Sequence, residues 1–465
     1  MMQSIKNVSS RALSIALAAG SVVTAAGAQA PATKITTRQL AAPTATSTEV
    51  LGSLAAVRQL PNGSVLVNDQ AKRRVLLLDK ELKLVGVVAD STPDTHAAYG
   101  ARPGGLLAYR GDSTLFVDPA SLSMLVIDPS GKIVRPIAAP RPNDVQFLTG
   151  GAFGNPGFDT KGRLVYAMRD NGMRGMRPPE PGKPFVMPTP PDSAAVVRFD
   201  LAARKLDTLG FYKIPKLNIS MTQDDRGAMR ASVTMNPLPV VDEWVVLSDG
   251  TVAIVRGQDY HVDLYGADGK TSAPKIPYEW QRMTDDDKTK FLDSSKAAIE
   301  KVRASVASGA TSPQQAIGAA GGGAFSMGDG GGARQMIVIG GDGGGRGGPP
   351  PAGAPAGAAG GTFGNAGFTV PPVSMVPISE LPDYKPVFGQ NAVRADMDDH
   401  IWVRTILTKP TTGGAIYEVL NKEGNLVDRV QIPVGTTIAG FGAGGVIYLG
   451  FRDAAGIHVQ RALSK

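Results

Sequence analysis

The stretch that decides the fold reads Val57-Arg-Gln-Leu-Pro-Asn-Gly63-Ser-Val-Leu-Val67-Asn-Asp69. It contains an apolar strand, a polar turn centred on glycine, a second apolar strand and a terminal charged residue. The same order returns as Asp242-Glu-Trp-Val-Val-Leu-Ser-Asp-Gly250-Thr-Val-Ala-Ile-Val255-Arg256. This repetition predicts a fold built from equivalent antiparallel sheets.

Six units of this kind can be traced along the chain. Their central turns stand at Gly63, Gly111-Asp112, Gly162, Gly250, Asp398-Asp399 and Gly444. The first two steps and the last one are each about 45 to 50 residues long, which is the length of a propeller blade. Because a single four-stranded unit cannot bury its own faces, six of them are expected to stack around an axis.

These motifs resemble the six-bladed β-propellers of the NHL and TolB-like group, from Leu51 to Ala462. The resemblance implies an all-β fold, a six-bladed β-propeller. In this chain a helical and Gly/Pro-rich insertion is expected between blades four and five. An irregular pair of β-sandwiches is the alternative architecture, because patterns of short strands do not by themselves determine how the sheets pack.

The N-terminus has the features of a secretory signal. Lys6 and Arg11 precede a run of small and apolar residues that is too short and too polar to span a membrane, and cleavage is expected after Ala28. The chain has no cysteine for a lipid anchor or a disulfide. We therefore expect a soluble periplasmic or secreted protein without a transmembrane anchor; a disordered tail on a cytosolic protein is the alternative.

The predicted organisation follows from the repeat and its interruptions. It comprises a signal peptide (1–28), a polar leader (29–48), blades one to four (49–276), an insertion (277–389) and blades five and six (390–465). The insertion contains a predicted helix over 284–307, which Thr284 can cap, followed by a Gly-rich segment over 309–367 whose composition cannot build a core. Two shorter interruptions cover 170–193 and 212–239.

Composition excludes some partners. The chain has 465 residues, is 42% hydrophobic and carries a net charge of +7. This excess is spread without dense blocks of lysine and arginine, so nucleic acid is not an expected partner. The Gly-rich runs lack the spacing of phosphate or calcium loops, and no cofactor is expected. A monomer is expected.

The phase of the repeat predicts where a ligand binds. The loop after each second strand and the loops between blades open on one face, and all three interruptions fall in such loops, which marks this as the binding face. Four arginines follow second strands there: Arg169, Arg256, Arg404 and Arg452. Guanidinium groups suit carboxylate, phosphate or sulfate ligands. The alternative is that each arginine pairs with a neighbouring acid as a strut between blades, and Tyr260 and His261 could join either arrangement.

Catalytic chemistry has weaker support in the sequence. The four histidines form no zinc-binding pair, there is no nucleophile elbow, and Asp396, Asp398 and Asp399 match the turn of the other blades. We expect no metal site. Some propellers of the resembling group are metal-dependent lactonases, but a ring of arginines disfavours a divalent cation.

The sequence therefore favours an exported binding module over an enzyme, without deciding between them. The predicted ligand is an anionic small molecule, a glycan, a peptide or a protein partner at the insertion-bearing face. A hydrolase or lyase with its site in the same funnel is the rival. A structural envelope protein without a funnel ligand is the third possibility.

Overall fold

The computed structural model describes residues 35–92, 98–151, 154–169, 191–216, 218–223, 229–308, 373–408 and 411–464. Two compact units divide the chain, Met1–Ile35 and Thr36–Lys465, and all of the elements below belong to the second. The predicted signal segment, the Gly-rich segment over 309–367 and most of the interruption over 170–193 lie outside the described residues. None of the described helices is both long and apolar enough to cross a membrane.

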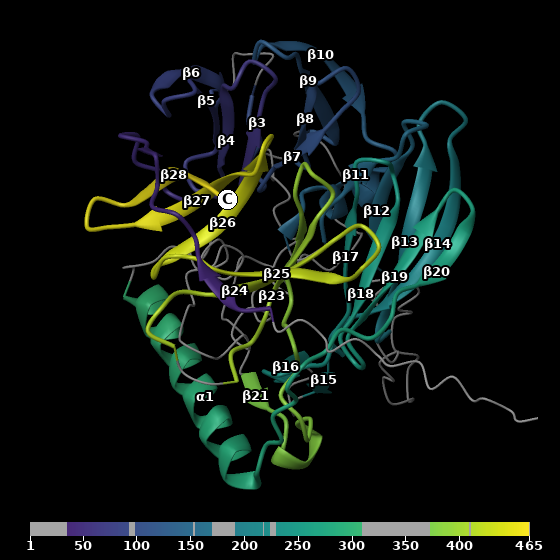
Figure 1. Cartoon of the computed structure of the whole chain (residues 1–465), viewed down its shortest axis with the longest axis vertical. Coiled ribbons are helices and arrows are strands. Elements are labelled where there is room, and N and C mark those ends of the chain that lie inside the picture. Colours follow the sequence, from purple (N-terminus) through teal and green to yellow (C-terminus); the bar gives the residue numbers. More distant parts are fainter. Residues whose placement is uncertain are drawn as a thin grey trace, which may run out of the picture. The chain divides into compact units, whose positions relative to one another are not determined.

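Six antiparallel sheets surround a common centre (Figure 1). Blades one and two contain β3 (Ala56–Gln59), β4 (Val65–Asp69), β5 (Arg74–Leu78), β6 (Leu84–Ala89), β7 (Gly105–Ala108), β8 (Thr114–Asp118), β9 (Ser123–Ile127) and β10 (Ile133–Ala138). Blades three and four contain β11 (Gly157–Phe158), β12 (Leu164–Met168), β13 (Ser193–Asp200), β14 (Lys205–Lys213), β17 (Glu243–Val246), β18 (Val252–Arg256), β19 (His261–Gly266) and β20 (Gly269–Ser272). Blades five and six contain β22 (Val393–Ala395), β23 (Ile401–Arg404), β24 (Ile416–Leu420), β25 (Leu426–Gln431), β26 (Thr436–Gly442), β27 (Val446–Arg452) and β28 (Ile457–Leu463).

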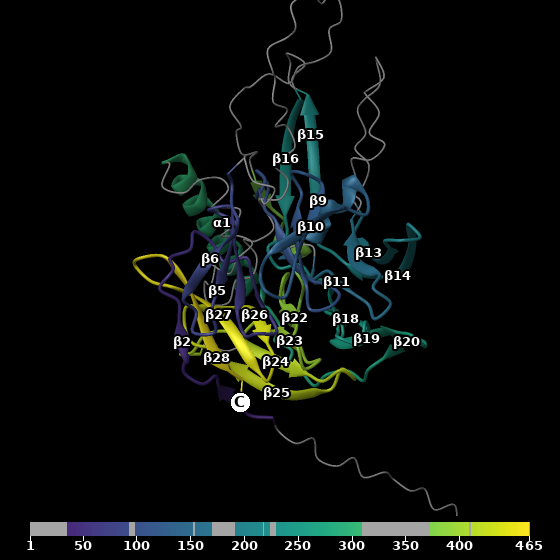
Figure 2. The same cartoon turned by 90° about the horizontal axis from the view of Figure 1, so that it is seen from above.

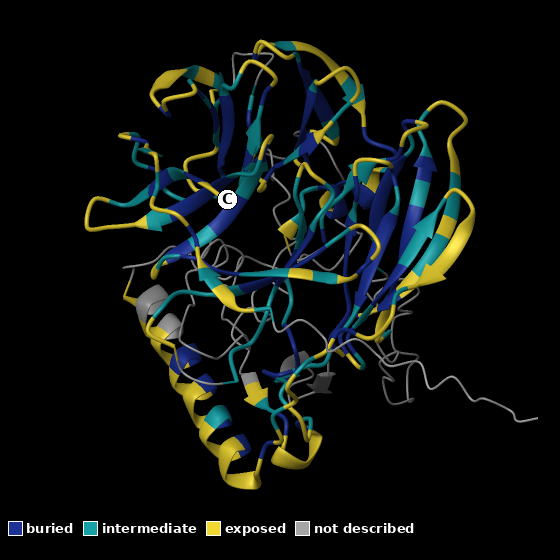
Figure 3. Ribbon diagram, in the orientation of Figure 1, coloured by how far each residue is buried: buried dark blue, intermediate teal, exposed yellow. Residues whose placement is uncertain are grey.

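The sheets close into a ring. Inner strand β3 contacts β26 on one side and β7 on the other, β11 contacts β7 and β17, and β17 contacts β22. A separate cluster of buried apolar side chains fills each of the six spaces between neighbouring blades. Figure 3 shows the burial concentrated in these facing strands, with exposure on the outer ones. The chain is thus a six-bladed β-propeller, as the repeat predicts.

The leader supplies two strands that the sequence does not signal. β2 (Ala45–Thr46) pairs with β28 and provides the fourth strand of blade six, while β1 (Thr37–Gln39) adds to β25 of blade five in parallel. Pairing of the two chain ends closes the ring and covers the outer edges of blades five and six.

The turn between the first two strands of a blade explains the recurring glycine. Gly250 has a φ of +80°, and a Cβ atom there would lie 2.8 Å from the Cα of Asp159 in blade three. Only glycine meets both demands. In blade five the corresponding turn residue is Asp399, with a φ of +62°, and its carboxylate accepts hydrogen bonds from the amide and hydroxyl of Ser248 in blade four.

Two interruptions form a small additional layer. β15 (Asn218–Gln223) pairs with β16 (Met229–Met235), and β16 pairs in parallel with β21 (Val373–Met375). Helix α1 (Asp285–Ala307) begins one residue after Thr284, whose hydroxyl accepts a hydrogen bond from the Asp287 amide while Asp287 accepts one from the Thr284 amide. An apolar cluster that includes Leu238, Leu292 and Val376 joins these segments. Figure 2 shows β15, β16 and α1 toward one side of the ring.

Candidate functional site

The four predicted arginines do not occupy one equivalent position. Arg256 stands six residues after the turn residue Gly250, whereas Arg404 stands five residues after Asp399. Because side chains alternate along a strand, this difference of one residue directs the two arginines to opposite faces of their blades. Arg169 follows its turn glycine, Gly162, by seven residues, and Arg452 follows Gly444 by eight. The prediction that all four share one phase is therefore wrong, and each has its own surroundings.

Arg256 is a strut. Its Nη1 donates to Oδ2 of Asp242 and to the carbonyl oxygen of Phe211 in blade three, and its Nε donates to Oδ2 of Asp263, all at 2.8 Å. Burial alone would raise the pKa of Asp263, but hydrogen bonds from Ser272, Lys270 and Arg256 lower it to about 2. These contacts occupy the Arg256 guanidinium within the protein.

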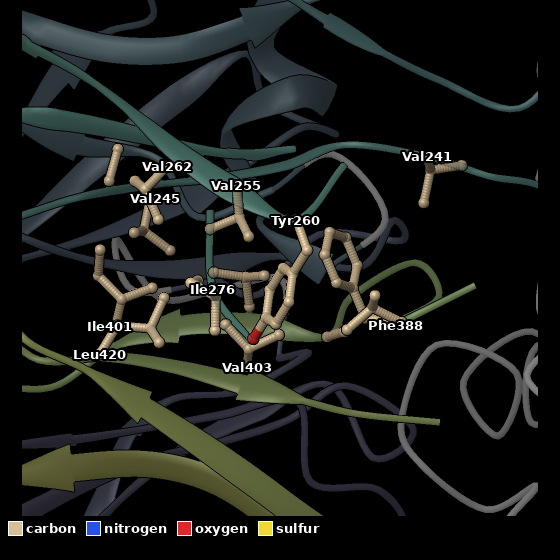
Figure 4. Close-up of a cluster of buried hydrophobic side chains, with 14 of the residues drawn as sticks. Val241, Val245, Val255, Tyr260, Val262, Ile276, Phe388, Ile401, Val403 and Leu420 are labelled. Atoms are coloured by element: carbon tan, nitrogen blue, oxygen red, sulfur yellow. The ribbon is translucent and has the colours of Figure 1, made fainter. Parts of the chain in front are cut away.

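Tyr260 also serves the joint between blades, whereas His261 contacts acids of its own blade. Tyr260 is fully buried among apolar side chains of blades four and five (Figure 4), and its hydroxyl donates to Oε2 of Glu418 in blade five at 2.7 Å. Burial, together with the charge of Glu418, raises the pKa of Tyr260 well above its ordinary value. His261 is half-buried, with Nδ1 at 2.8 Å from Asp259 and Nε2 at 3.4 Å from Asp263.

We expect Tyr260→Phe to lower the free energy of unfolding by about 1 to 2 kcal/mol, because it leaves one buried oxygen of Glu418 without its donor. Arg429 still donates to the other oxygen of Glu418, which limits the loss. Chemical denaturation of both proteins measures the effect. An unchanged midpoint would mean that this hydrogen bond contributes no net stability.

Arg169 and Arg452 differ in their contacts. The Nε of Arg169 donates to the Tyr212 hydroxyl at 3.1 Å, and its guanidinium lies 5.8 Å from the centre of that ring. Arg452 is exposed at the end of β27 and makes no hydrogen bond or ion pair with the part of the chain that the structure describes.

A buried glutamate that the repeat does not signal lies among the arginines. Glu243 is the first residue of β17, is 7% exposed, and accepts a hydrogen bond at Oε1 from the backbone amide of Asn391 at 3.0 Å. Burial raises the pKa of Glu243 to about 7, while that hydrogen bond and the positive charges of Arg169, Arg404 and Arg394 counteract the rise. Three guanidinium groups thus act on one carboxylate.

A hydrogen bond across the ring links the two blades on either side of Glu243. The amide nitrogen of Asn155, just before β11 of blade three, donates to the carbonyl oxygen of Val393 in blade five at 2.9 Å. Blades three and five are not neighbours, and blade four with Glu243 stands between them. The bond therefore spans the inner ends of three successive blades, and its acceptor, Val393, directly precedes Arg394.

Arg394 and Arg404 have cationic groups available for a ligand. Among the described residues neither side chain makes a hydrogen bond, and neither comes within the 4.0 Å that defines an ion pair with Glu243. Desolvation lowers the pKa of Arg394, which shows that it lies deep in the protein, yet both arginines keep part of their surface accessible. We call Glu243, Arg169, Arg394 and Arg404 the axial cluster; its formal charge is +2 when Glu243 is ionised.

The axial cluster lies at the inner ends of the loops that carry the insertions. Arg169 directly precedes the interruption over 170–193, Glu243 follows the one over 212–239, and Arg394 follows the one over 277–389. The sequence identified Arg169 and Arg404 but missed Glu243 and Arg394. One signal was present: the other inner strands begin with Ala56, Gly105, Gly157, Val393 and Thr436, so a charged residue at this point is peculiar to blade four.

The pH dependence of stability can test the state of Glu243. Its pKa in the folded chain, about 7, lies above the ordinary value of 4.5, so the folded state binds more protons between these values and stability falls as pH rises through that window. We expect a fall on the order of 1 kcal/mol relative to Glu243→Gln, reduced by the neighbouring positive charges. Denaturation of both proteins at pH 5 and pH 8 measures it. Parallel pH profiles would show that Glu243 keeps an ordinary pKa.

Other acidic and histidine residues hold loops in place. Asp396 accepts hydrogen bonds from the amides of Asp398 and His400 and from the Trp402 indole, which is the predicted turn chemistry. Asp69 likewise accepts bonds from the amides of its own and the preceding loop. No group of three or more His, Cys, Asp or Glu side chains within the described ranges is arranged to hold a metal ion.

The comparisons with known proteins give limited information. No family model matches the sequence, and no curated protein shows significant similarity to it. The structure is similar to that of a supposed exported protein from Bacteroides fragilis, with 9% identity, a TM-score of 0.37 and coverage of 93% of this chain and 95% of that one. A supposed gluconolactonase has 10% identity, a TM-score of 0.33 and coverage of 90% and 93%. Virginiamycin B lyase from Staphylococcus aureus has 12% identity, a TM-score of 0.27 and coverage of 50% and 73%. Likenesses this weak carry no inference about function.

Fold and site together define the class of this protein. It is a six-bladed β-propeller whose ring is closed by strands from both ends of the propeller unit. Blade four carries a buried glutamate, Glu243, on which the positive charges of Arg169, Arg394 and Arg404 act.

Proposed function

We propose that this chain is an exported propeller that binds an anionic small molecule, or an acidic group of a glycan or peptide, at the axial cluster. The observation that carries the proposal is the contrast between two kinds of arginine. The guanidinium group of Arg256 donates hydrogen bonds to Asp242, Asp263 and a backbone carbonyl, as a structural arginine does. Arg394 and Arg404 have no hydrogen-bond partner among the described residues although both are partly buried near the axis.

The energetics favour an anion at this place. A guanidinium that is partly withdrawn from water gains more from a carboxylate or phosphate than an exposed one, because the local dielectric constant is lower. Within the part of the chain that the structure describes, Arg394 and Arg404 act on the single carboxylate of Glu243, so the two guanidinium groups leave an excess of positive charge. An anionic ligand removes that excess, and the fork geometry of arginine adds bidentate hydrogen bonds.

The test is calorimetric titration of the purified protein with succinate at low ionic strength. We expect one site per chain, with an affinity that falls as sodium chloride is added because chloride and screening weaken an electrostatic site. Acetamide, which is neutral, serves as the control and should not bind. An affinity for succinate that is independent of salt would argue against a cationic site.

A hydrolase or lyase at the same place is the second candidate, and one observation favours it. Burial raises the pKa of Glu243 to about 7, which is the value a general base needs at neutral pH. In an enzyme, Glu243→Gln would abolish turnover while the ligand still bound. In a binding module the wild-type chain would release every ligand unchanged, which mass spectrometry of the recovered ligand detects.

A further inference from the structure

A series of aromatic rings leads from the buried joint between blades four and five to the surface. The centre of the Tyr260 ring lies 6.1 Å from that of Phe388 (Figure 4) and 5.9 Å from that of Tyr278. The Tyr278 hydroxyl donates a hydrogen bond to the carbonyl oxygen of Ile406 at 3.2 Å, and its ring contacts the Trp280 ring edge-on at 5.3 Å between centres. Trp280 ends the series and is 38% exposed. An exposed ring that is held in this way loses little side-chain entropy when a ligand stacks on it.

Two more exposed side chains belong to the same surface. An antiparallel bridge places Arg282 opposite Tyr384. Two backbone hydrogen bonds flank the bridge, from the Met283 amide to Asp383 and from the Lys385 amide to Gln281. Opposed side chains share one face of such a bridge, and so do residues two apart in an extended segment. Burial agrees, because Met283 is buried whereas Arg282 and Tyr384 are exposed. We call Trp280, Arg282 and Tyr384 the aromatic platform.

The residues around the aromatic platform favour a sugar over a protein partner. A protein interface needs a contiguous apolar patch, but the exposed residues next to these rings, Glu279 and Asp383, are charged. A pyranose ring has a C–H face that can stack on an aromatic ring and a polar edge that suits charged surroundings.

Arg282 adds a preference for negative charge. Its guanidinium group makes no hydrogen bond or ion pair with the part of the chain that the structure describes. The neighbouring acid, Asp383, accepts its hydrogen bond from Nζ of Lys288, at 2.8 Å. A guanidinium group with available donors holds a carboxylate with two hydrogen bonds.

We propose that the aromatic platform binds a glycan that contains uronic acid units, with one pyranose ring stacked on Trp280 and its carboxylate held by Arg282. Tyr384 then contacts a neighbouring sugar unit. This inference does not rest on the proposed function, because the aromatic platform shares no residue with the axial cluster. It gives the chain a second binding site at the start of the insertion between blades four and five.

Fluorescence reports on this site directly. The chain has three tryptophans, and the other two, Trp244 and Trp402, are buried. Trigalacturonate at low salt should change the emission of Trp280 and protect it from quenching by acrylamide. The methyl ester of the same trisaccharide keeps the rings without the charge. It should bind about 10-fold more weakly, because the charge-assisted hydrogen bonds from Arg282 are lost.

Calorimetry of variants separates the two contributions. Trp280→Ala should bind trigalacturonate at least about 10-fold more weakly, whereas Trp280→Phe keeps a ring and should retain most of the affinity. Arg282→Met should bind trigalacturonate no more tightly than the methyl ester. Phe211→Ala is the matched control, because it removes an aromatic ring that is 60% exposed on β14; its affinities should stay within about twofold of the wild-type values.

Wild-type affinity in Trp280→Ala, or no binding of trigalacturonate to the wild-type chain, would overturn the inference. Equal affinity for trigalacturonate and its methyl ester would also overturn it, since Arg282 would then select no charge. The double variant with Arg394→Met and Arg404→Met distinguishes the two sites: it should lose succinate and keep the fluorescence response to trigalacturonate. A response lost together with succinate binding would place the glycan at the axial cluster and overturn this inference alone. A response in a wild-type chain that binds no succinate would instead support this inference and contradict the proposed function.

Discussion

A double variant with Arg394→Met and Arg404→Met is expected to bind succinate at least about 100-fold more weakly than the wild-type chain, because each lost charge-assisted hydrogen bond is worth about 1.5 to 3 kcal/mol. Methionine keeps the length and apolar body of the arginine side chain and removes only its charge and donors. Neither arginine makes a hydrogen bond with the described residues, so the melting temperature should fall little. Calorimetric titration and thermal denaturation of the same preparations measure both quantities.

Arg452→Met provides the matched control. It also removes one arginine that follows a second strand, but from the exposed end of β27 in blade six. Its affinity for succinate should stay within about twofold of the wild-type value, since an exposed charge outside the site contributes mainly screened, long-range attraction. An equal loss in the control and the double variant would locate the site in a broad cationic rim and not in the axial cluster.

Arg256→Ala is expected to have the largest effect on stability, a loss of about 3 kcal/mol in the free energy of unfolding. The variant leaves the buried carboxylate of Asp242 without its cationic partner and leaves Asp263 with Lys270 in place of two such partners. Asp242 and Asp263 are both almost fully buried, at 7% and 2% exposure, and each loses its guanidinium donor. Arg256 itself keeps a side-chain exposure of 19%, which places the expected loss at the lower end of the range for buried pairs. Urea denaturation followed by fluorescence measures the loss.

Lys275→Ala is the control for that variant. Lys275 lies 3.4 Å from Asp259, but its side chain is 73% exposed, and such pairs contribute less than about 0.5 kcal/mol. If Arg256→Ala proved as stable as Lys275→Ala while losing affinity for succinate, Arg256 would be a ligand residue and its description as a strut would fail.

Most of the fold could be predicted because its information is local. Each blade carries its own alternating strands and its own turn, and the turn at Gly250 needs a residue that tolerates a positive φ. Strands β1 and β2 could not be predicted. They are three and two residues long and form only through pairing with β25 and β28 at the far end of the chain, so no local pattern marks them.

The site was harder to predict because it depends on which face of a blade each side chain occupies, and residue type alone does not give this. Arg256 and Arg404 each end a second strand, but their registers differ by one residue. Arg256 is held by two aspartates, whereas Arg404 makes no hydrogen bond with the described residues. The acids that hold Arg256 come from the entry to its blade and from β19, which the repeat does not connect to it. Glu243 and Arg394 lie on inner strands, where sequence alternation does not tell which side chains reach the axis.

The most direct test of the central claim is a crystal structure of the chain with succinate bound. We expect density for one succinate, with its carboxylates against Arg394 and Arg404. Succinate bound on Arg256, Arg452 or another surface, with Arg394 and Arg404 unoccupied at saturating succinate, would contradict the proposed site.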